Sequence, residues 1–87
     1  MLDDIRIIDF THVYFGPYST MIMADMGADV IKIEPPWGEM TRLYPPHFGG
    51  MSSTFHYLDR NKRCVALNLK DPKALKIVKD LIKQSDV

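Results

Sequence analysis

The segment that most constrains the fold is residues 29–34, a run rich in β-branched side chains that meets two consecutive prolines. Valine and isoleucine pack well on the pleated surface of a sheet and favour strands. Pro35 and Pro36 stop the run, because proline donates no ladder hydrogen bond and drives the residue before it out of the helical region. The sequence therefore predicts a strand that ends at Glu34.

The chain before this strand predicts another strand and a helix. Residues 5–10 form a compact apolar run that leads into a loop, which is the pattern of a buried strand. Pro17 suits the first position of a helix, and Gly27 suits a left-handed cap at its end. We therefore expect a helix of about ten residues between Pro17 and Gly27.

The second half of the chain predicts a third strand and a second helix. Residues 64–69 return to strand character, and Asp71-Pro72 is typical of an N-cap followed by proline at the first helical position. A broad apolar face then recurs at helical spacing as far as about Gln84, with lysines on the opposite side. Residues 85–87 fit a turn and the first residue of a further strand.

This alternation of strands and helices places the chain in the α/β class, as an open parallel sheet with helices on its faces. The intervening residues 35–56 carry four prolines and are predicted to form a long loop, which in a compact domain is usually functional. Three parallel strands need cover on both faces, and two helices supply little of it. We therefore expect residues 1–87 to be an incomplete domain, either from the N-terminal part of a larger α/β protein or from a truncated reading frame.

The composition excludes several classes of function. Eleven basic and eleven acidic residues cancel, whereas a general nucleic-acid-binding chain carries a basic surplus. The single cysteine, Cys64, cannot form an internal disulfide and indicates a reducing, cytoplasmic setting. No apolar run approaches the roughly 20 residues that span a bilayer, and no basic leader opens the chain. We expect neither a nucleic-acid partner nor a membrane segment.

The loop after the first strand is the first candidate for ligand binding, because it leads to a helix N-terminus. Residues 11–16 contain a single glycine, Gly16, whereas a dinucleotide-binding loop needs three. The bulky Tyr14 and Phe15 stand where a dinucleotide pyrophosphate needs room. Glu34 has the position of the acid that binds ribose in nicotinamide enzymes, but the accompanying glycines are missing. A nicotinamide cofactor is therefore not expected.

The histidines suggest acid–base chemistry more than metal binding. His12 follows the first strand and is a candidate general acid or base, or else a loop histidine bonded to a backbone carbonyl. His47 and His56 lie in the long loop at a spacing that matches no standard metal site. No metal ion is therefore expected.

Cations gather at both ends of the third strand. Lys62 and Arg63, with Asn61, suit either a phosphate-bearing ligand or a solvated turn. Lys70 follows the strand at the sheet edge where ligands of open α/β folds bind. The loop aromatics Tyr14, Phe15, Trp37 and Tyr44 either stack on a ligand or plug a small core.

Six segments of the sequence carry a more specific signal. They are residues 7–13 (IIDFTHV), Gly16-Pro17, residues 23–34 (MADMGADVIKIE), Met40-Thr41-Arg42, Asn61-Lys62-Arg63 and residues 67–72 (LNLKDP). In this order and spacing they resemble the N-terminal part of the family III CoA-transferases, the group of formyl-CoA:oxalate, carnitine and bile-acid CoA-transferases. The resemblance covers nearly the whole chain.

The resemblance implies a Rossmann-like, CoA-binding large domain in a longer polypeptide, with two chains interlocked like rings into a homodimer. The implied reaction moves coenzyme A from an acyl-CoA to a carboxylic acid, without a metal. The family uses an aspartate carboxylate as nucleophile, which forms a mixed anhydride and then an aspartyl-CoA thioester. That aspartate lies beyond residue 87 in the family, so no catalytic residue is expected in this chain.

Carried over by position, the resemblance also implies where the cofactor binds. The cofactor-binding residues would be Tyr14, Phe15, Pro35, Leu67, Asn68, Leu69 and Lys70, and the residues lining the active site would be His12, Val13 and Arg42. Lys70 is the main cation of this set. Pro35 stands where such transferases often place an arginine on the nucleotide, which implies a modified nucleotide pocket with Arg42 as the candidate replacement.

Two alternatives stay open. The α-methylacyl-CoA racemases share the fold and much of the pattern, although the His12-Val13 pair and the long segment between Arg42 and Asn61 favour a transferase. In the second alternative, the chain is a CoA-binding remnant that catalyses no reaction. Isolated residues 1–87 are expected to fold poorly, because apolar strand and helix surfaces would lack partners.

Overall fold

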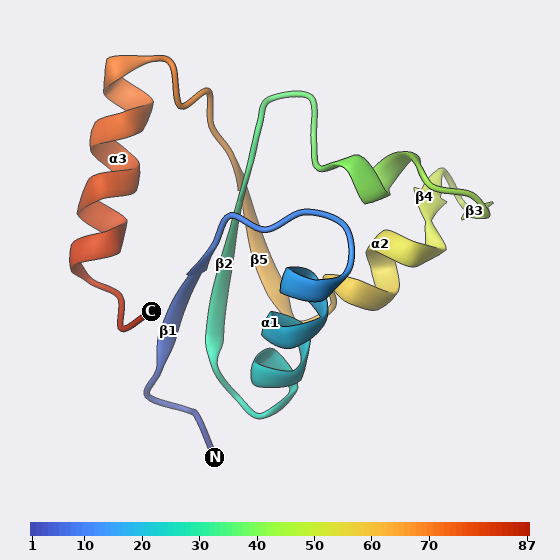
Figure 1. The fold of residues 1–87 in the computed structure, drawn as a ribbon, viewed down its shortest axis with the longest axis horizontal. Helices are drawn as coiled ribbons and strands as arrows, with labels where there is room; N and C mark the ends of the chain where they lie inside the picture. Colours follow the sequence, from blue (N-terminus) through green and yellow to red (C-terminus); the bar gives the residue numbers. More distant parts are fainter.

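The computed structural model describes all of residues 1–87 and shows the predicted alternation of strands and helices (Figure 1). The elements are β1 (Arg6–Asp9), α1 (Phe15–Asp25), β2 (Asp29–Glu34), the 3₁₀ helix η1 (Met40–Leu43), β3 (His47–Phe48), β4 (Met51–Ser52), α2 (Ser53–Leu58), β5 (Lys62–Ala66) and α3 (Pro72–Lys83). None of the helices has both the length and the apolar character to cross a lipid bilayer.

The main sheet contains three parallel strands in the order β1-β2-β5, which confirms the predicted α/β class. The central strand β2 is buried from Val30 to Glu34, as expected for a strand covered on both faces. It ends at Glu34, where the two prolines were expected to stop it. All three strands run in one direction, so the segments that follow them meet at one edge of the sheet.

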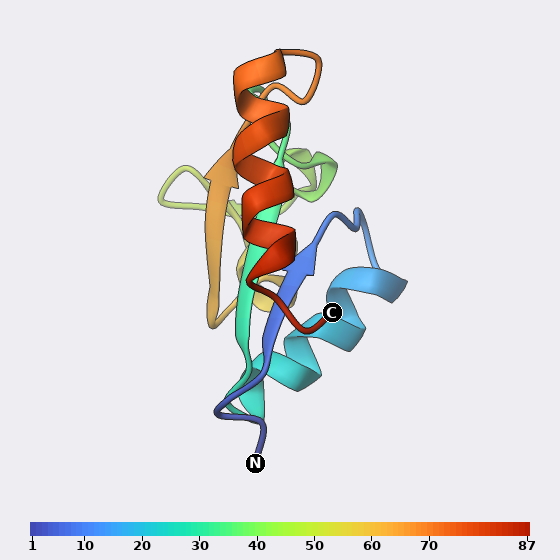
Figure 2. The same cartoon turned by 90° about the vertical axis from the view of Figure 1, so that its left-hand side faces the viewer.

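Helices cover both faces of the sheet, with α1 and α2 on one side and α3 on the other (Figures 1 and 2). On the α3 side, Ile31 and Ile33 form a buried cluster with Val78. On the α1 side, Val30 packs in a second cluster with Ala24. The sheet therefore divides the apolar core into two thin layers.

The caps predicted from the sequence are confirmed. Gly27 follows the C-cap residue Met26 of α1 and has a φ of +103°, in the left-handed region that favours glycine. Asp71 caps α3, since its carboxylate accepts a hydrogen bond of 2.9 Å from the backbone N–H of Lys73. The C-terminal residue also behaves as the sequence suggests: Ile8 N–H donates to the carbonyl of Val87 at 2.9 Å, so the chain returns to the free edge of β1.

Residues 35–56, predicted to form a long loop, contain several short elements of secondary structure. This segment holds η1, the two-stranded antiparallel pair of β3 and β4, and the first turn of α2. These elements are short and are fixed by local contacts, such as the Ser52 hydroxyl that accepts from Phe55 N–H and donates to the Tyr44 carbonyl. Elements of two to six residues leave no periodic apolar pattern to detect.

The third strand begins and ends earlier than predicted, at Lys62 and Ala66 instead of residues 64 and 69. Lys62 pairs in register with Val30, and its charge is compensated by buried carboxylates. Beyond Ala66, a single ladder bond continues from Leu67 N–H to the Glu34 carbonyl at 2.8 Å. The first helix likewise starts at Phe15, two residues before the expected Pro17.

Candidate functional site

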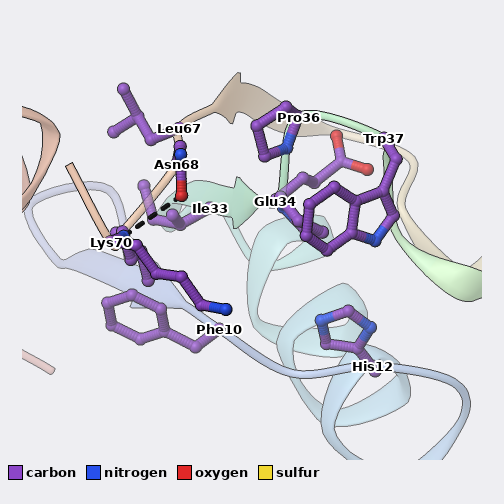
Figure 3. A pocket seen from close by; sticks show the side chains of 11 residues that line it. Phe10, His12, Ile33, Glu34, Pro36, Trp37, Leu67, Asn68 and Lys70 are labelled. Carbon is purple, nitrogen blue, oxygen red and sulfur yellow. Dashed lines mark hydrogen bonds between the residues drawn. The ribbon is translucent and has the colours of Figure 1, made fainter.

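A pocket of about 410 Å³ lies at the carboxyl edge of the sheet, where the segments after β1, β2 and β5 converge (Figure 3). Its lining residues are Phe10 and His12 after β1, Ile33, Glu34, Pro35, Pro36 and Trp37 at the end of β2, and Leu67, Asn68, Leu69 and Lys70 after β5. This is the position at which open α/β sheets bind ligands. The volume is within the range of small-molecule sites.

The turn between β5 and α3 presents Lys70 to this pocket. The Asn68 side-chain oxygen accepts from Lys70 N–H at 3.2 Å, and the Asn68 carbonyl accepts from Asp71 N–H at 2.9 Å. In Figure 3 the stem of Lys70 runs beside the Phe10 ring and its ammonium reaches toward the pocket interior. This arrangement sets one cation among apolar and aromatic walls, which suits a planar ring that carries phosphate.

The only carboxylate in the lining is Glu34, and Arg42 neutralises it. The two side chains form a bidentate pair, and the Arg42 guanidinium also stacks over the ring of Phe55, 3.8 Å from its centroid. The Arg42 guanidinium is thus already engaged by protein groups. The pocket therefore has an excess of positive charge from Lys70 despite the acid in its wall.

Six of the predicted site residues come together in the pocket, namely His12, Pro35, Leu67, Asn68, Leu69 and Lys70. Val13, Tyr14 and Phe15 do not line it: they form the turn into α1, where Val13 has a φ of 69° and Phe15 is 96% exposed. Arg42 is not in the lining either, and pairs with Glu34, which is. The cofactor contacts and the active-site lining that the resemblance implies stay predictions for all ten residues.

The cations that were predicted to precede the third strand lie at the start of β5, at the edge of the sheet opposite the pocket, and they are engaged by acids. Asn61 donates to Asp25 at 2.7 Å, and Arg63 pairs with Asp29 at 2.7 Å. The side chain of Lys62 is wholly buried. A phosphate site at this end of the strand is therefore not supported, and Lys62 does not belong to a solvated turn either.

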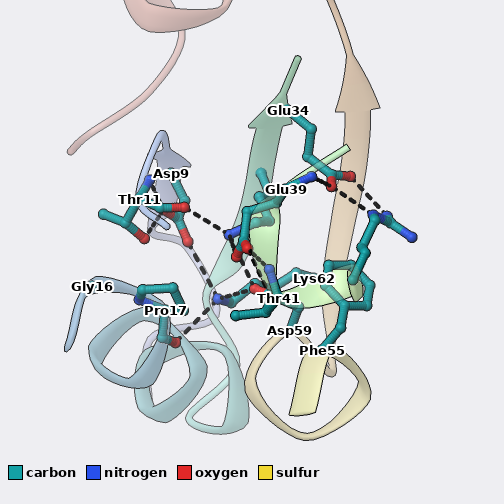
Figure 4. Close-up of polar contacts among 12 residues, drawn as sticks. Asp9, Thr11, Gly16, Pro17, Glu34, Glu39, Thr41, Phe55, Asp59 and Lys62 are labelled. Carbon is teal, nitrogen blue, oxygen red and sulfur yellow. Dashed lines mark hydrogen bonds and ion pairs between the residues drawn. The ribbon is translucent and has the colours of Figure 1, made fainter. Parts of the chain in front are cut away.

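A cluster of buried charged side chains lies between the sheet and the layer of α1 and α2 (Figure 4). It consists of Asp9, Lys32, Glu39, Asp59 and Lys62, and we call it the buried charge cluster. The Lys62 ammonium contacts Asp9 at 3.2 Å and Asp59 at 2.8 Å. The Lys32 ammonium contacts Glu39 at 3.3 Å and Asp59 at 3.2 Å. Three carboxylates thus share two ammonium groups.

Within this cluster Asp9 anchors the loop after β1. Its Oδ1 accepts from the N–H of Thr11 at 2.7 Å, and its Oδ2 accepts from the hydroxyl of Thr20 on α1 at 2.7 Å. Burial by itself raises the pKa of Asp9, but the bonds from Thr11 and Thr20 and the charge of Lys32 outweigh it and leave the pKa below its usual value. Asp9 therefore stays charged and has a structural role.

The close approach of this loop to α1 explains Gly16. A Cβ at Gly16 would collide with the side chain of Thr11, which Asp9 holds in place. The loop therefore requires glycine at this position because of space, not because of its backbone angles. No group of three His, Cys, Asp or Glu side chains is placed to hold a metal ion.

Sequence comparisons match nearly the whole chain to one family of proteins. Residues 2–87 match the family model described as CoA-transferase family III. The chain is 46% identical to human succinyl-CoA:glutarate CoA-transferase and 44% identical to formyl-CoA:oxalate CoA-transferase from Rhodopseudomonas palustris, each over 99% of this chain. It is 43% identical to acetyl-CoA:oxalate CoA-transferase from Acetobacter aceti over 98% of this chain. These matches cover 20 to 22% of the relatives, so the chain spans about a fifth of their length.

Solved structures share the fold. A crystal structure of a CAIB/BAIF family protein from Brucella suis superposes with a TM-score of 0.91 at 29% identity, over 98% of this chain and 24% of that one. A hypothetical protein from Mycobacterium tuberculosis gives a TM-score of 0.86 at 33% identity, over 99% of this chain and 24% of that one. The strand order described above, and the sheet edge at which the pocket lies, therefore belong to a fold that is known from much longer proteins.

Proposed function

Because this chain belongs to CoA-transferase family III, we propose that the complete protein moves coenzyme A from an acyl-CoA to a carboxylic acid. Residues 1–87 would form the N-terminal segment of its CoA-binding large domain. The observation that carries the proposal is the pocket at the carboxyl edge of the sheet, where six residues assigned to the site by resemblance converge. The curated relatives named above are CoA-transferases, which favours a transferase over a racemase.

The pocket would hold the nucleotide part of the CoA thioester. Lys70 supplies positive charge for a phosphate, and Trp37 and Phe10 offer aromatic faces to a base. The pairing of Arg42 with Glu34 keeps the one acid of the wall from repelling an anionic ligand. In this proposal the pocket wall has no cation at the position of Pro35. Arg42 favours nucleotide binding indirectly, because it neutralises Glu34.

The exchange of acids needs a nucleophile from outside residues 1–87. An aspartate carboxylate would attack the acyl-CoA carbonyl, which forms a mixed anhydride and releases the CoA thiolate. The thiolate would then attack the aspartyl carbonyl, which releases the first acid and leaves an aspartyl-CoA thioester. An incoming carboxylate repeats the two steps in reverse order, so the exchange balances without water or an oxidant. Residues 1–87 would bind and orient the thioester throughout.

We further propose a dicarboxylic acid as the acceptor. The names of the similar proteins pair a CoA thioester with glutarate, oxalate or mesaconate, all of which are dicarboxylates. A homodimer and a cytoplasmic location belong to the same proposal. The resemblance to the interlocked family supports the dimer, and the free thiol of Cys64 is compatible with a reducing compartment.

The test uses the complete protein that carries this N-terminus. It is incubated with succinyl-CoA or acetyl-CoA and with glutarate, oxalate or mesaconate, and new thioesters are identified by mass spectrometry. A new thioester is the expected result. Deuterium uptake at the α-carbon of a branched acyl-CoA without exchange would instead show a racemase. Tight CoA binding with neither reaction would show a binding protein, and light scattering of the same sample measures the dimer.

A further inference from the structure

The buried ammonium of Lys32 contacts three segments that are distant in the sequence. Its Nζ donates to the carbonyl of Thr11 at 2.9 Å, in the loop after β1. It lies 3.3 Å from Glu39, in the segment after β2, and 3.2 Å from Asp59, which caps α2. Lys32 and its two acidic partners have no exposed side-chain surface. The contacts are therefore internal and do not depend on solvent.

Two of these segments carry walls of the pocket. Thr11 directly precedes His12, and Glu39 follows Trp37 by two residues, while both His12 and Trp37 line the pocket (Figure 3). Lys32 itself is not in the lining. Its ammonium thus joins the two loops without lining the pocket.

Glu39 extends this link to the acid of the pocket wall. Its backbone N–H donates to Glu34 at 2.9 Å, and its Oε2 accepts from the hydroxyl of Thr41 at 2.8 Å (Figure 4). Its other oxygen, Oε1, accepts no hydrogen bond from the protein, so the Lys32 ammonium is the charge that compensates it. Asp59, in contrast, keeps a second cation in Lys62. Loss of Lys32 would therefore leave Glu39 as the uncompensated group.

We propose that Lys32 is a positioning residue for the ligand pocket: it fixes the spacing between the loop that carries His12 and the loop that carries Trp37. Its identification with CoA binding rests on the proposed function. If Lys32 only stabilised the fold, a buried acid anywhere in the protein could serve as its partner. Lys32 instead bonds to a backbone carbonyl in one pocket loop and to a carboxylate in the other.

The experiment compares three variants of the complete protein, Lys32→Met, the double variant Lys32→Met/Glu39→Gln, and Lys76→Met on the exposed face of α3 as the matched control. Lys32→Met alone leaves a buried carboxylate unpaired and should lower the thermal midpoint. The double variant removes that charge and should recover most of the midpoint, because a buried pair can be replaced as a unit at little cost. The double variant thereby separates the effect of Lys32 on the stability of the protein from its effect on the position of the two loops.

Two measurements are then made on the stable double variant. Hydrogen–deuterium exchange of peptides covering residues 10–16 and 35–42 should be about tenfold faster than in the wild type, the scale of one lost charge-assisted hydrogen bond, while α3 is unchanged. The KM for the CoA thioester should rise about tenfold with kcat changed less than about twofold. Lys76→Met should match the wild type in both.

The outcomes distinguish this inference from the proposed function. Unchanged exchange in both loops of the double variant would overturn the positioning role, whatever the ligand. Recovery of a wild-type KM together with the thermal midpoint would also overturn it, since Lys32 would then be merely structural. A wild-type protein that fails to bind CoA would refute the proposed function, and the exchange experiment would still decide whether Lys32 spaces the loops.

Discussion

Arg42 binds both carboxylate oxygens of Glu34, with Nε 2.7 Å from Oε1 and Nη2 2.8 Å from Oε2. Burial alone raises the pKa of Glu34, but the hydrogen bonds from Arg42 and from the Glu39 backbone outweigh it and leave the pKa lowered. The acid at the end of β2 is therefore charged and paired at the same time. In the proposed function, this pair keeps the carboxylate in the pocket wall from repelling an anionic ligand.

Replacement of Arg42 by glutamine should expose the charge of Glu34 to the ligand. In the complete protein we expect Arg42→Gln to raise the KM for the CoA thioester about tenfold, the scale of a unit charge acting across several ångströms of protein. The double variant Glu34→Gln/Arg42→Gln should recover most of this loss, because it carries no unpaired acid. Arg60→Gln, which breaks a surface pair with Asp25, is the control. Equal KM values for the single and double variants would contradict the prediction.

Lys70 is predicted to contact a phosphate of the ligand. Lys70→Met keeps the length of the side chain and removes its charge, so the KM for the CoA thioester should rise about tenfold with kcat preserved. The effect should shrink as salt is added, because screening weakens the lost attraction in the wild type. Steady-state kinetics at two ionic strengths measure both effects. Lys79→Met on α3 should leave KM and its salt dependence unchanged, and a similar change in both variants would argue against a specific contact.

Gly16→Ala tests the close approach between the loop after β1 and α1. The added Cβ would meet the side chain of Thr11, and relief of that contact requires a shift of the loop. We expect a loss of about 1 to 3 kcal/mol in the free energy of unfolding, as for other overpacked sites. Urea denaturation of the complete protein measures it. Ser19→Ala on the exposed side of the same helix should cost no more than about 0.5 kcal/mol, and a loss of that size for Gly16→Ala would show that the loop yields freely.

Asp9 should make the stability depend on pH. Its pKa in the folded protein lies below the ordinary value of 3.8, so its charged form stabilises the fold. This contribution is complete above about pH 4 and disappears as the pH falls through the folded pKa, because the proton then binds in both states. The difference in unfolding free energy between the wild type and Asp9→Asn should thus be constant at neutral pH and shrink in acid. Denaturant titrations from pH 7 to pH 3 check this, and a difference independent of pH would contradict it.

The sheet and the edge at which the pocket lies could be predicted from the sequence because both depend on patterns of short range. The prolines after Glu34 and the Asp71-Pro72 pair mark where β2 ends and where α3 begins. Once the strands are known to be parallel, their following segments must share one edge, which places Lys70 near His12. The pocket follows from this topology.

The buried charge cluster could not be predicted in the same way. Lys32 and Lys62 are charged residues within strands, and charged residues are almost never fully buried unless they are paired. Their partners Asp9, Glu39 and Asp59 lie 3 to 53 positions away in the sequence, and no spacing marks such pairs. A charged residue at the centre of an apolar strand was the available signal, and Lys32 in β2 carries it.

The sharing of two ammonium groups among three carboxylates has a consequence for the exchange of parts between proteins. Neither Lys32 nor Lys62 can be neutralised alone without leaving three buried carboxylates to share a single ammonium group. In related sequences each of these lysines is therefore expected to change together with one of its acidic partners. A designer who grafts a different pocket onto this strand–helix scaffold must therefore replace each lysine together with an acidic partner, or refill the volume of the whole cluster with apolar side chains in one step.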